Sequence, residues 1–379
     1  MIYDVAVAGL GGMGSAILAH CAERGATVAG FDRFGPGHGL GASTGKTRLI
    51  RKAYFEDPAY VPLLHRAYEL WHALEAATGA DLLQLTGVLI VGAEESPIVR
   101  GVQRSAREHH LLVETLSRRE LAARYPTLRL LEGEVGLLEA EGGVLQPERA
   151  IEAHLQVATR AGAQAHFEVA VEEWQPHGSG FELRLSDGTT VAARKLVLAM
   201  GPWLGDTLNA LHVPTRIQRN VQVWFTPDTD AYKAENFPGF LVDRVGLPAP
   251  LYGFPDFGEG VKAAFHGAGT FRHPDELARE IDPASDVAPL AAALEEWMPG
   301  AAHRFREGKA CMYTLTPDHH FVVDRHPEYA GVILCGGFSG HGFKFAPVVG
   351  EIAADLALAG ETAHDIGFLS LRRFPKASP

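Results

Sequence analysis

The sequence has few cysteines, a shortage of positive charge and no long apolar run. Its three cysteines, Cys21, Cys311 and Cys335, are an odd number far apart, which indicates a reducing cytoplasm rather than a disulfide framework. Lysine and arginine number 34 against 46 acidic residues, and the net charge of −12 argues against a nucleic-acid surface. We find no segment as long as a membrane span and no signal-like N-terminal stretch. We therefore expect a cytoplasmic protein that binds neither nucleic acid nor membranes.

The length of the chain predicts two domains, because 379 residues exceed the usual size of one hydrophobic core. A content of 46% hydrophobic and 21% charged residues is typical of a globular protein. The sequence has no repeat, no low-complexity tract and no long linker. We therefore expect the two domains to be interleaved along the chain, with the ligand site between them.

A nucleotide-binding unit begins almost at the start of the chain. Residues 5–8 form an apolar run typical of a buried parallel strand, and Gly9-Leu10-Gly11-Gly12-Met13-Gly14 follows directly. A helix is expected to end near Gly25, and a second strand over residues 27–31 leads to Asp32. The presence of strand, helix and acid together argues against a glycine-rich turn in an ordinary α/β protein.

Each part of this unit has a physical role. Gly9 makes the tight turn, Gly11 lets the backbone approach a pyrophosphate, and Gly14 lets the helix lie close to the strand. The first amides of the helix would face the phosphates, and Asp32 stands where a carboxylate accepts hydrogen bonds from a ribose. The unit predicts a bound dinucleotide, and by itself it does not distinguish FAD from NAD.

Later apolar segments predict the strands of two sheets. Residues 195–201 and 332–335 are expected to return to the parallel sheet under the cofactor. Residues 216–225, 251–254 and 260–265 are typical of a separate antiparallel sheet.

Between these sheets the sequence predicts a short hairpin. Residues 181–185 and 190–192 read as its two strands, joined by the turn Asp187-Gly188, and a further strand is expected over residues 167–174.

Four separated segments carry a more specific pattern. They are Thr47-Arg48-Leu49-Ile50-Arg51 with Ala53-Tyr54, Tyr252-Gly253-Phe254-Pro255 with Lys262 and His266, Cys311-Met312-Tyr313-Thr314, and residues 337–345. Together they resemble the monomeric sarcosine oxidase and N-methyltryptophan oxidase group of amine-oxidising flavoenzymes. The resemblance extends from Tyr3 to about Asp365. It implies FAD as cofactor, a secondary amino acid (N-methylated or cyclic) as substrate, and oxygen as electron acceptor, with hydrogen peroxide as a product.

The resemblance also implies the architecture. The fold class is α/β plus α+β, with a Rossmann-like FAD-binding domain interleaved with a catalytic domain built on an antiparallel sheet. We assign residues 1–84, 146–214 and 318–379 to the FAD-binding domain, and residues 85–145 and 215–317 to the catalytic domain. A monomer is implied.

The resemblance and the nucleotide unit together give a set of expected FAD-binding residues. They are Gly9, Gly11, Gly12, Met13, Gly14, Asp32, Arg33, Thr44, Arg48, Val171, Gly201, Cys311, Gly340, Gly342, Phe343 and Lys344.

For Cys311 the resemblance implies a thioether to the flavin ring. That bond needs a thiolate and is favoured by a positive neighbour, for which Arg48 is the candidate. The alternative for Cys311 is an ordinary buried thiol. The chain departs from the family here, because Thr44 stands where a histidine is common and Lys46 replaces an acid.

The candidate catalytic residues are Arg51, Tyr252, Lys262, His266 and Lys344. Arg51 and Lys344 would hold the substrate carboxylate, since an arginine fork donates two parallel hydrogen bonds and a lysine adds a compact charge. By resemblance, Tyr252 and His266 lie on the substrate side of the flavin. Lys262 is implied to lie on the opposite side, where an ammonium stabilises superoxide. The alternative for Lys262 is an outward-facing strand residue.

Three other functions stay open from the sequence. A flavin dehydrogenase would use an acceptor other than oxygen, which Lys262 argues against. A NAD-dependent dehydrogenase shares the glycine pattern but gives no account of Cys311 or of residues 337–345. The third is a flavin-bearing binding protein without catalysis. No spacing of side chains is typical of zinc or iron, so we expect no metal.

Overall fold

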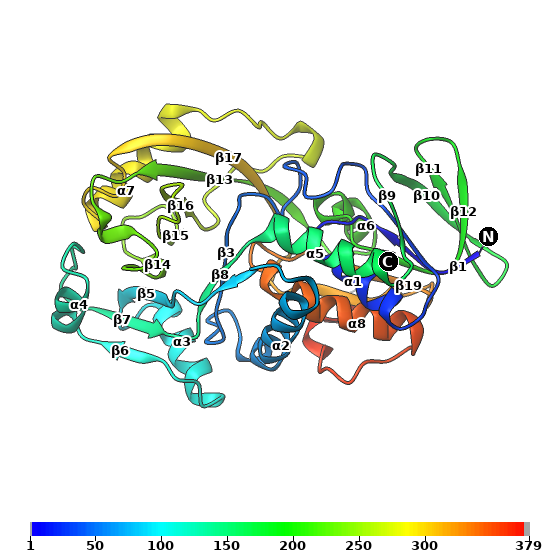
Figure 1. Ribbon diagram of the computed structural model, residues 1–379, viewed down its shortest axis with the longest axis horizontal. Helices are drawn as coiled ribbons and strands as arrows, with labels where there is room; N and C mark the ends of the chain where they lie inside the picture. The colour runs from blue at the N-terminus through cyan, green and yellow to red at the C-terminus, as the bar shows by residue number, and fades with distance from the viewer. Residues whose placement is uncertain (1, 375–379) are drawn as a thin grey trace.

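The computed structural model describes residues 2–374, which form two large sheets and a small one between them (Figure 1). The first sheet has a parallel core in the order β19-β12-β1-β2-β9. Its strands are β1 (Ile2–Ala8), β2 (Val28–Phe31), β9 (Gln164–His166), β12 (Thr190–Leu198) and β19 (Val332–Gly336), with β10 (Val171–His177), β11 (Gly180–Leu185) and β18 (Val322–Arg325) added antiparallel.

Strand β12 corrects two predictions at once. We expected a hairpin strand over residues 190–192 and a separate buried strand over 195–201, but Thr190–Leu198 is a single strand. Its first half pairs antiparallel with β11, and its second half runs parallel to β1 and β19. The burial of the chain changes along this strand, which is why its two halves look like different elements in the sequence.

The second large sheet has the order β17-β13-β16-β15-β14-β5-β7-β6. Its strands are β5 (Val88–Ala93), β6 (Glu114–Leu116), β7 (Glu134–Glu139), β13 (Arg216–Thr226), β14 (Gly239–Asp243), β15 (Leu251–Phe254), β16 (Val261–Phe265) and β17 (Arg304–Leu315). The predicted antiparallel sheet is therefore mixed, because β14 and β5 are parallel neighbours and every other pair is antiparallel. The sequence analysis also missed β17, the long edge strand that carries Cys311.

A small third sheet lies between the two large ones in Figure 1. It consists of β3 (Arg48–Ile50), β8 (Gly143–Leu145) and β4 (Leu83–Gln84), in the order β3-β8-β4. Strands of two or three residues are too short to show an alternating pattern, so they could not be predicted from the sequence. Arg51 follows β3 directly.

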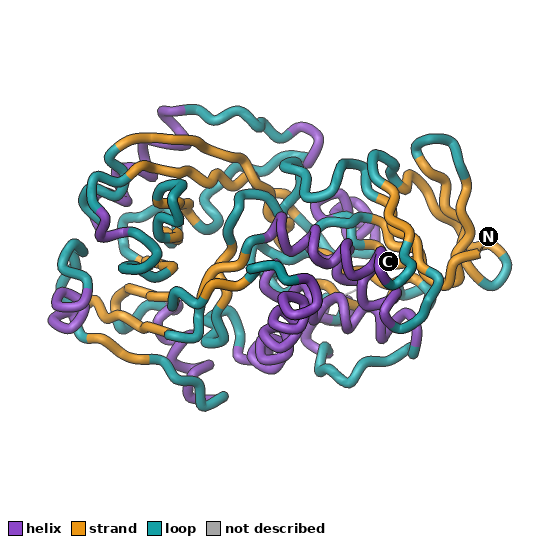
Figure 2. Tube along the Cα trace, viewed as in Figure 1, coloured by secondary structure: helices purple, strands orange, loops and turns teal. Residues whose placement is uncertain are grey.

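The longer helices gather on the first sheet, as Figure 2 shows. They are α1 (Gly12–Glu23), α2 (Val61–Thr78), α5 (Pro147–Arg160) and α8 (Ala346–Leu358), while α3 (Pro97–Glu108), α4 (Arg118–Arg124) and α7 (Ala288–Trp297) belong to the second sheet and α6 (Gly205–Ala210) follows β12. Helix α1 packs against α5 and α8. The contact between α1 and α8 is close, since a Cβ added at Gly350 of α8 would lie 2.8 Å from the Cβ of Ala16 in α1.

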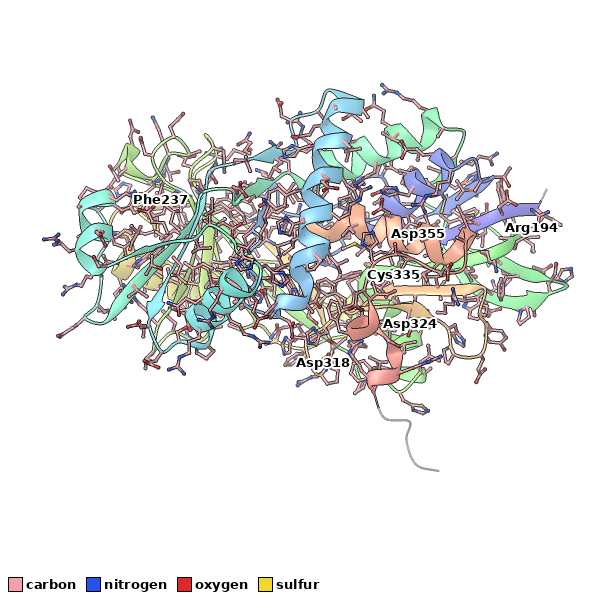
Figure 3. All side chains as sticks on the ribbon, turned by 90° about the horizontal axis from the view of Figure 1, so that it is seen from below. Arg194, Phe237, Asp318, Asp324, Cys335 and Asp355 are labelled. Carbon is pink, nitrogen blue, oxygen red and sulfur yellow. The ribbon has the colours of Figure 1, made fainter. Side chains whose placement is uncertain are left out.

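Local signals explain where these helices begin and end. The Ser96 side chain accepts hydrogen bonds from two amides of the first turn of α3, and α2 ends at Gly79 with a φ of 72°. Seen from below in Figure 3, α2 lies between the half of the molecule that contains Phe237 and the half that contains Cys335. None of the helices within residues 2–374 is long and apolar enough to cross a membrane.

Candidate active site

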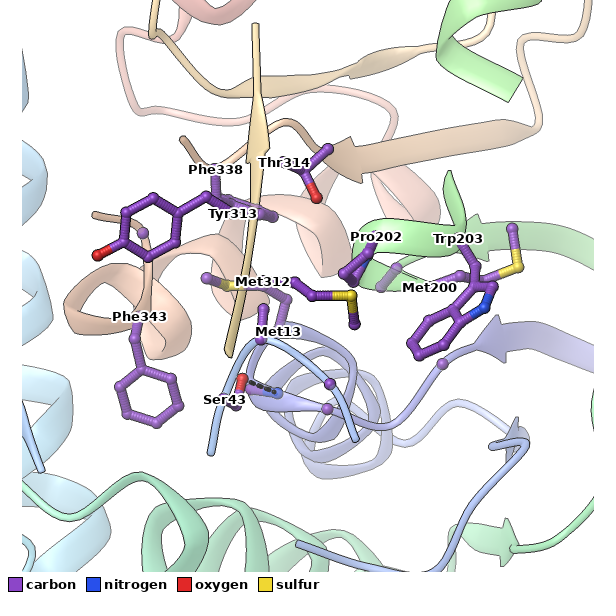
Figure 4. A pocket seen from close by; sticks show the side chains of 18 of the residues that line it. Met13, Ser43, Met200, Pro202, Trp203, Met312, Tyr313, Thr314, Phe338 and Phe343 are labelled. Carbon is purple, nitrogen blue, oxygen red and sulfur yellow. Dashed lines mark hydrogen bonds between the residues drawn. The ribbon is translucent and has the colours of Figure 1, made fainter. Parts of the chain in front are cut away.

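A cavity of about 1020 Å³ opens between the two large sheets (Figure 4). One wall is formed by the carboxyl ends of β1, β2 and β12 and by the residues that follow them. The opposite wall comes from β13, β15 and β17, and two largely irregular segments, residues 37–56 with the short β3 and residues 337–344, complete it. The carboxyl edge of a parallel sheet is the usual place for a nucleotide, so the cavity lies where the sequence predicts.

The glycine-rich turn has the shape needed for a pyrophosphate. Gly9 has a φ of 89°, and a Cβ at Gly14 would lie 1.7 Å from the Gly9 carbonyl oxygen, so neither position accepts a side chain. A Cβ at Gly11 would meet no atom within 4 Å, because Gly11 faces the cavity. Helix α1 begins at Gly12, whose amide donates to the Ser43 hydroxyl at 3.3 Å, the dashed line in Figure 4. This turn leaves room for an anion at the helix N-terminus.

Asp32 is fixed at the end of β2. Its carboxylate accepts hydrogen bonds from the amides of Leu10 at 2.7 Å and Phe34 at 2.8 Å, and it is 6% exposed on the cavity wall. Each carboxylate oxygen has two acceptor sites, so both oxygens can still accept a ribose hydroxyl. Arg33 and Val171 lie on the same cavity wall.

A buried ion pair marks the other end of the cavity. The Arg51 guanidinium is 5% exposed, donates from Nη2 to Glu56 Oε2 at 2.8 Å, and packs over the rings of Tyr54 and Phe55. Burial by itself would raise the pKa of Glu56, but the charges of Arg51 and Lys344 lower it to about 2. Arg51 Nε has no partner within residues 2–374 although it is buried. Arg51 also lines the cavity, where its charge attracts an incoming anion.

Lys344 is the second cation on this wall, and it is 5% exposed. Its Nζ donates to the His341 carbonyl oxygen at 2.7 Å and to the Tyr54 hydroxyl at 3.4 Å. Burial and the charge of Arg51 lower the pKa of Lys344 to about 7.

His341 lines the cavity and is neutral. Burial lowers the pKa of His341 to about 3. Its Nε2 lies 3.0 Å from the His319 carbonyl oxygen, which can only accept, so Nε2 carries the proton. Nδ1 therefore accepts from the Tyr54 hydroxyl at 2.6 Å.

Three aromatic side chains form a polar cluster near these cations. The Tyr313 hydroxyl lies 3.3 Å from the Tyr252 hydroxyl and 3.4 Å from His266 Nδ1, and Asn220 Nδ2 donates to it at 3.2 Å. Burial raises the pKa of Tyr252 and of Tyr313, and it lowers the pKa of His266 to about 4. At neutral pH the cluster is thus uncharged, and its hydroxyls and imidazole can donate and accept hydrogen bonds.

Lys262 lies behind a loop and not on the cavity wall. Its Nζ donates to the carbonyl oxygens of Gly45 at 2.6 Å and Thr47 at 2.9 Å, and to the Thr47 hydroxyl at 3.0 Å. The two carbonyl oxygens can only accept, so two N–H groups of Lys262 point at this loop, while the Thr47 hydroxyl can either accept from or donate to the nitrogen. Burial and the charge of Arg48 lower the pKa of Lys262 well below its usual value. Lys262 is 2% exposed, so it is not an outward-facing strand residue.

Cys311 lies next to Arg48. Its Sγ is 3.8 Å from Arg48 Nη2 and 3.4 Å from the Ala42 carbonyl oxygen. Cys311 does not line the cavity, although Met312 and Tyr313 beside it do. All three cysteines are buried and free.

The structure brings most of the expected site residues to one cavity. Those on its wall are Gly9, Gly11, Gly12, Met13, Asp32, Arg33, Arg48, Arg51, Val171, Gly201, Tyr252, His266, Gly340, Gly342, Phe343 and Lys344. Those not on the wall are Gly14, Thr44, Lys262 and Cys311. Gly14 packs against Gly9 and Ala199, and Thr44 is fully buried directly before the residues Gly45 and Thr47 that cover Lys262.

The sequence analysis missed a buried polar face of β13, of which Gln222 lines the cavity. Gln218, Asn220 and Gln222 alternate along the strand and are at most 3% exposed. A polar residue at every second position of a predicted strand was the signal for this face. The buried oxygens Gln222 Oε1 and Thr44 Oγ1 have no hydrogen-bond partner within residues 2–374. Of these two residues, Gln222 lines the cavity, and its amide adds a polar group to a wall that fits a large polar cofactor such as FAD.

The comparison with known families decides the class of protein. The family model of FAD dependent oxidoreductases (DAO) matches residues 4–356. The chain belongs to this family. It is 43% identical over 382 residues to monomeric sarcosine oxidase of Streptomyces avermitilis, covering 99% of this chain and 98% of that protein. It is also 34% identical to N-methyl-L-tryptophan oxidase of Yersinia pestis, covering 99% and 100%.

Solved structures agree with these relatives. NikD, an unusual amino acid oxidase essential for nikkomycin biosynthesis, superimposes with a TM-score of 0.85 at 25% identity, over 97% of both chains. The predictions of the sarcosine oxidase group, of FAD as cofactor and of a Rossmann-like domain beside a second sheet domain are therefore confirmed.

Proposed function

We propose that the protein is an FAD-dependent oxidase of a secondary amino acid, N-methylated or cyclic, and that it releases an imine and hydrogen peroxide. One observation carries the proposal. Two buried cations, Arg51 and Lys344, line the same cavity as the glycine-rich turn and Asp32. The names of the two curated relatives, a sarcosine oxidase and an N-methyl-L-tryptophan oxidase, support the same substrate class.

The protein's own residues would bind and orient the substrate. FAD, when bound, would accept a hydride equivalent from the carbon next to the substrate nitrogen. Arg51 and Lys344, which both line the cavity, hold the carboxylate through their charges and N–H donors. His266 and Tyr252 are placed to hydrogen-bond the substrate amine, which must be neutral to react. Neutral His266 can accept such a bond, since burial lowers its pKa to about 4.

Anaerobic mixing with candidate substrates tests the proposal. We expect sarcosine, proline, pipecolate or an N-methylated aromatic amino acid to bleach the yellow flavin, and admitted air to restore the colour with formation of hydrogen peroxide. Bleaching without oxygen uptake would instead indicate a dehydrogenase. A protein that stays yellow with every amine would indicate a flavin-bearing binding protein, and a colourless holoprotein would contradict FAD.

We also propose that FAD is attached through Cys311. The nearby Arg48 guanidinium supports this, because a positive neighbour favours the thiolate that forms the thioether. We expect acid precipitation to give a yellow pellet and a colourless supernatant, and Cys311→Ser to reverse that result. Cys335→Ser, which changes a buried thiol in β19, should behave like the unchanged protein. A yellow supernatant from the unchanged protein would contradict attachment.

We propose the domain boundaries given above because each large sheet takes its strands from separate parts of the chain. Strands of the first sheet lie within residues 2–31, 164–198 and 322–336, and those of the second within 88–139 and 216–315. Residues 375–379 of the last segment lie outside the described residues. We also propose a cytoplasmic monomer, which the free thiols and the name of the Streptomyces relative support.

A further inference from the structure

The segment that carries Arg51 has no strand partner of its own. Strand β3 ends at Ile50, and the next regular element is a single turn, Pro58–Tyr60. The residues between them lack the ladder hydrogen bonds that fix backbone groups in a sheet. The position of the Arg51 guanidinium therefore depends on what holds the peptides beside it.

The carboxylate of Glu139 holds two of these peptides. Its Oε1 accepts from the Lys52 amide at 2.7 Å, and its Oε2 accepts from the Ala53 amide at 2.9 Å. Within residues 2–374 we find no other hydrogen-bond acceptor for either amide. A carboxylate that accepts from two consecutive amides fixes both the place and the orientation of the chain just after Arg51.

Glu139 is itself firmly placed. It is the last residue of β7 and is 5% exposed. Burial raises the pKa of Glu139, and the two amides and the charge of Arg51 oppose that rise. Glu139 does not line the cavity, whereas Arg51, Phe55 and Glu56 do, so its effect on a ligand has to pass through this segment.

Charge adds to the same effect. Burial by itself would lower the pKa of Arg51, but Glu56, Tyr54 and Glu139 together raise it above its usual value. Glu139 thus stabilises a guanidinium that would otherwise be costly to bury.

We propose that Glu139 is a positioning residue that sets Arg51 in place for the substrate carboxylate. The inference rests on the proposed function, because it needs Arg51 to bind that carboxylate. It links strand β7 of the second large sheet, which ends at Glu139, to the anion site that follows β3.

Glu139→Gln in the holoenzyme tests this role. The amide keeps the size of the side chain but turns one acceptor into an NH2 group facing a backbone N–H, so one of the two hydrogen bonds is lost. The probe is butyrate, the carbon isostere of sarcosine, which has a carboxylate and no amine. We expect its Kd, measured by the flavin absorbance change, to rise about tenfold. KM for the best substrate should rise by a similar factor, with a smaller change in kcat.

The same strand offers a matched control. Glu134, at the other end of β7, is also 5% exposed, and its carboxylate accepts from the Arg244 side chain, away from Arg51. Glu134→Gln should lower Tm and leave butyrate binding unchanged. If Glu139→Gln fails to fold, Glu139→Asp keeps the charge but is too short to reach both amides, and the same rise in Kd is expected.

Arg51→Lys separates this inference from the proposed function. If Glu139 acts through Arg51, adding Glu139→Gln to Arg51→Lys should not weaken butyrate binding further. The inference is overturned if Glu139→Gln leaves the Kd unchanged, or if its effect is as large in the Arg51→Lys background. If Arg51→Lys itself leaves the Kd unchanged, the carboxylate site of the proposed function is wrong.

Discussion

Replacing Lys262 with methionine should slow the reoxidation of the flavin by oxygen about 10²–10³-fold, while its reduction by substrate stays nearly as fast. The reason is electrostatic. Transfer of one electron to oxygen creates an anion, and a fixed ammonium in a buried site stabilises it without reorganisation. Lys262 is held by three oxygen acceptors of the loop at Gly45 and Thr47. Stopped-flow measurement of the two half-reactions checks the prediction.

Lys46 is the control for this experiment. Both ammonium groups lie over the Trp224 ring, at 5.5 Å for Lys46 and 5.2 Å for Lys262, but Lys46 is an exposed side chain paired with Glu259 and Glu307. Lys46→Met should leave both half-reactions unchanged. An equal loss of both half-reactions in Lys262→Met would show that the lysine supports the loop and has no special role toward oxygen.

Butyrate binding to the holoenzyme should weaken about tenfold for each pH unit above 7, and about 100-fold by pH 9. The cause is Lys344, whose pKa burial and Arg51 lower to about 7 in the free protein. Below that pH the ammonium is present, and the anion binds with full affinity. Above it, a proton must be taken up for the anion to bind, so the apparent Kd rises with pH. Titrations between pH 6 and pH 9 measure this slope.

Lys344→Met removes the titrating group, so its butyrate affinity should be weak at every pH and nearly independent of pH over this range. Arg51 stays charged throughout and cannot produce the slope, because its pKa lies above the usual arginine value. A slope of the same size in Lys344→Met would assign the titration to another group and would contradict the role of Lys344.

The parallel sheet and the glycine turn could be predicted because their signals are local. A buried strand, glycines at fixed spacing and Asp32 lie within one short stretch, and the turn is set by the φ of Gly9. The resemblance to known flavoenzymes added Arg51 and Lys344, which lie far apart in the chain and share one cavity wall. The types of residue at the site could therefore be predicted from the sequence.

The contacts of these side chains could not be predicted. Glu56 pairs with Arg51 inside an irregular segment, and Glu139 reaches the same segment from another sheet. Neither contact is associated with a regular spacing of residues, so neither could be predicted from the sequence. Lys262 and Cys311 are buried and do not line the cavity, because of how the loop at Thr44 folds. The types of side chain in that loop do not determine its fold.

The continuity of β12 connects two parts of the cavity wall that lie far apart in the sequence. Val171 begins a hairpin that is hydrogen-bonded onto the first half of this strand, and the other end of the strand leads into Ala199 and Gly201 beside the glycine turn. Because β12 is one unbroken strand, the hairpin that begins at Val171 and the residues beside the glycine turn belong to one hydrogen-bonded sheet, and we expect their separation to stay the same when a ligand binds. The same sheet would thus set the spacing of the groups that contact the dinucleotide, and substrate binding at the other end of the cavity would leave that spacing unchanged.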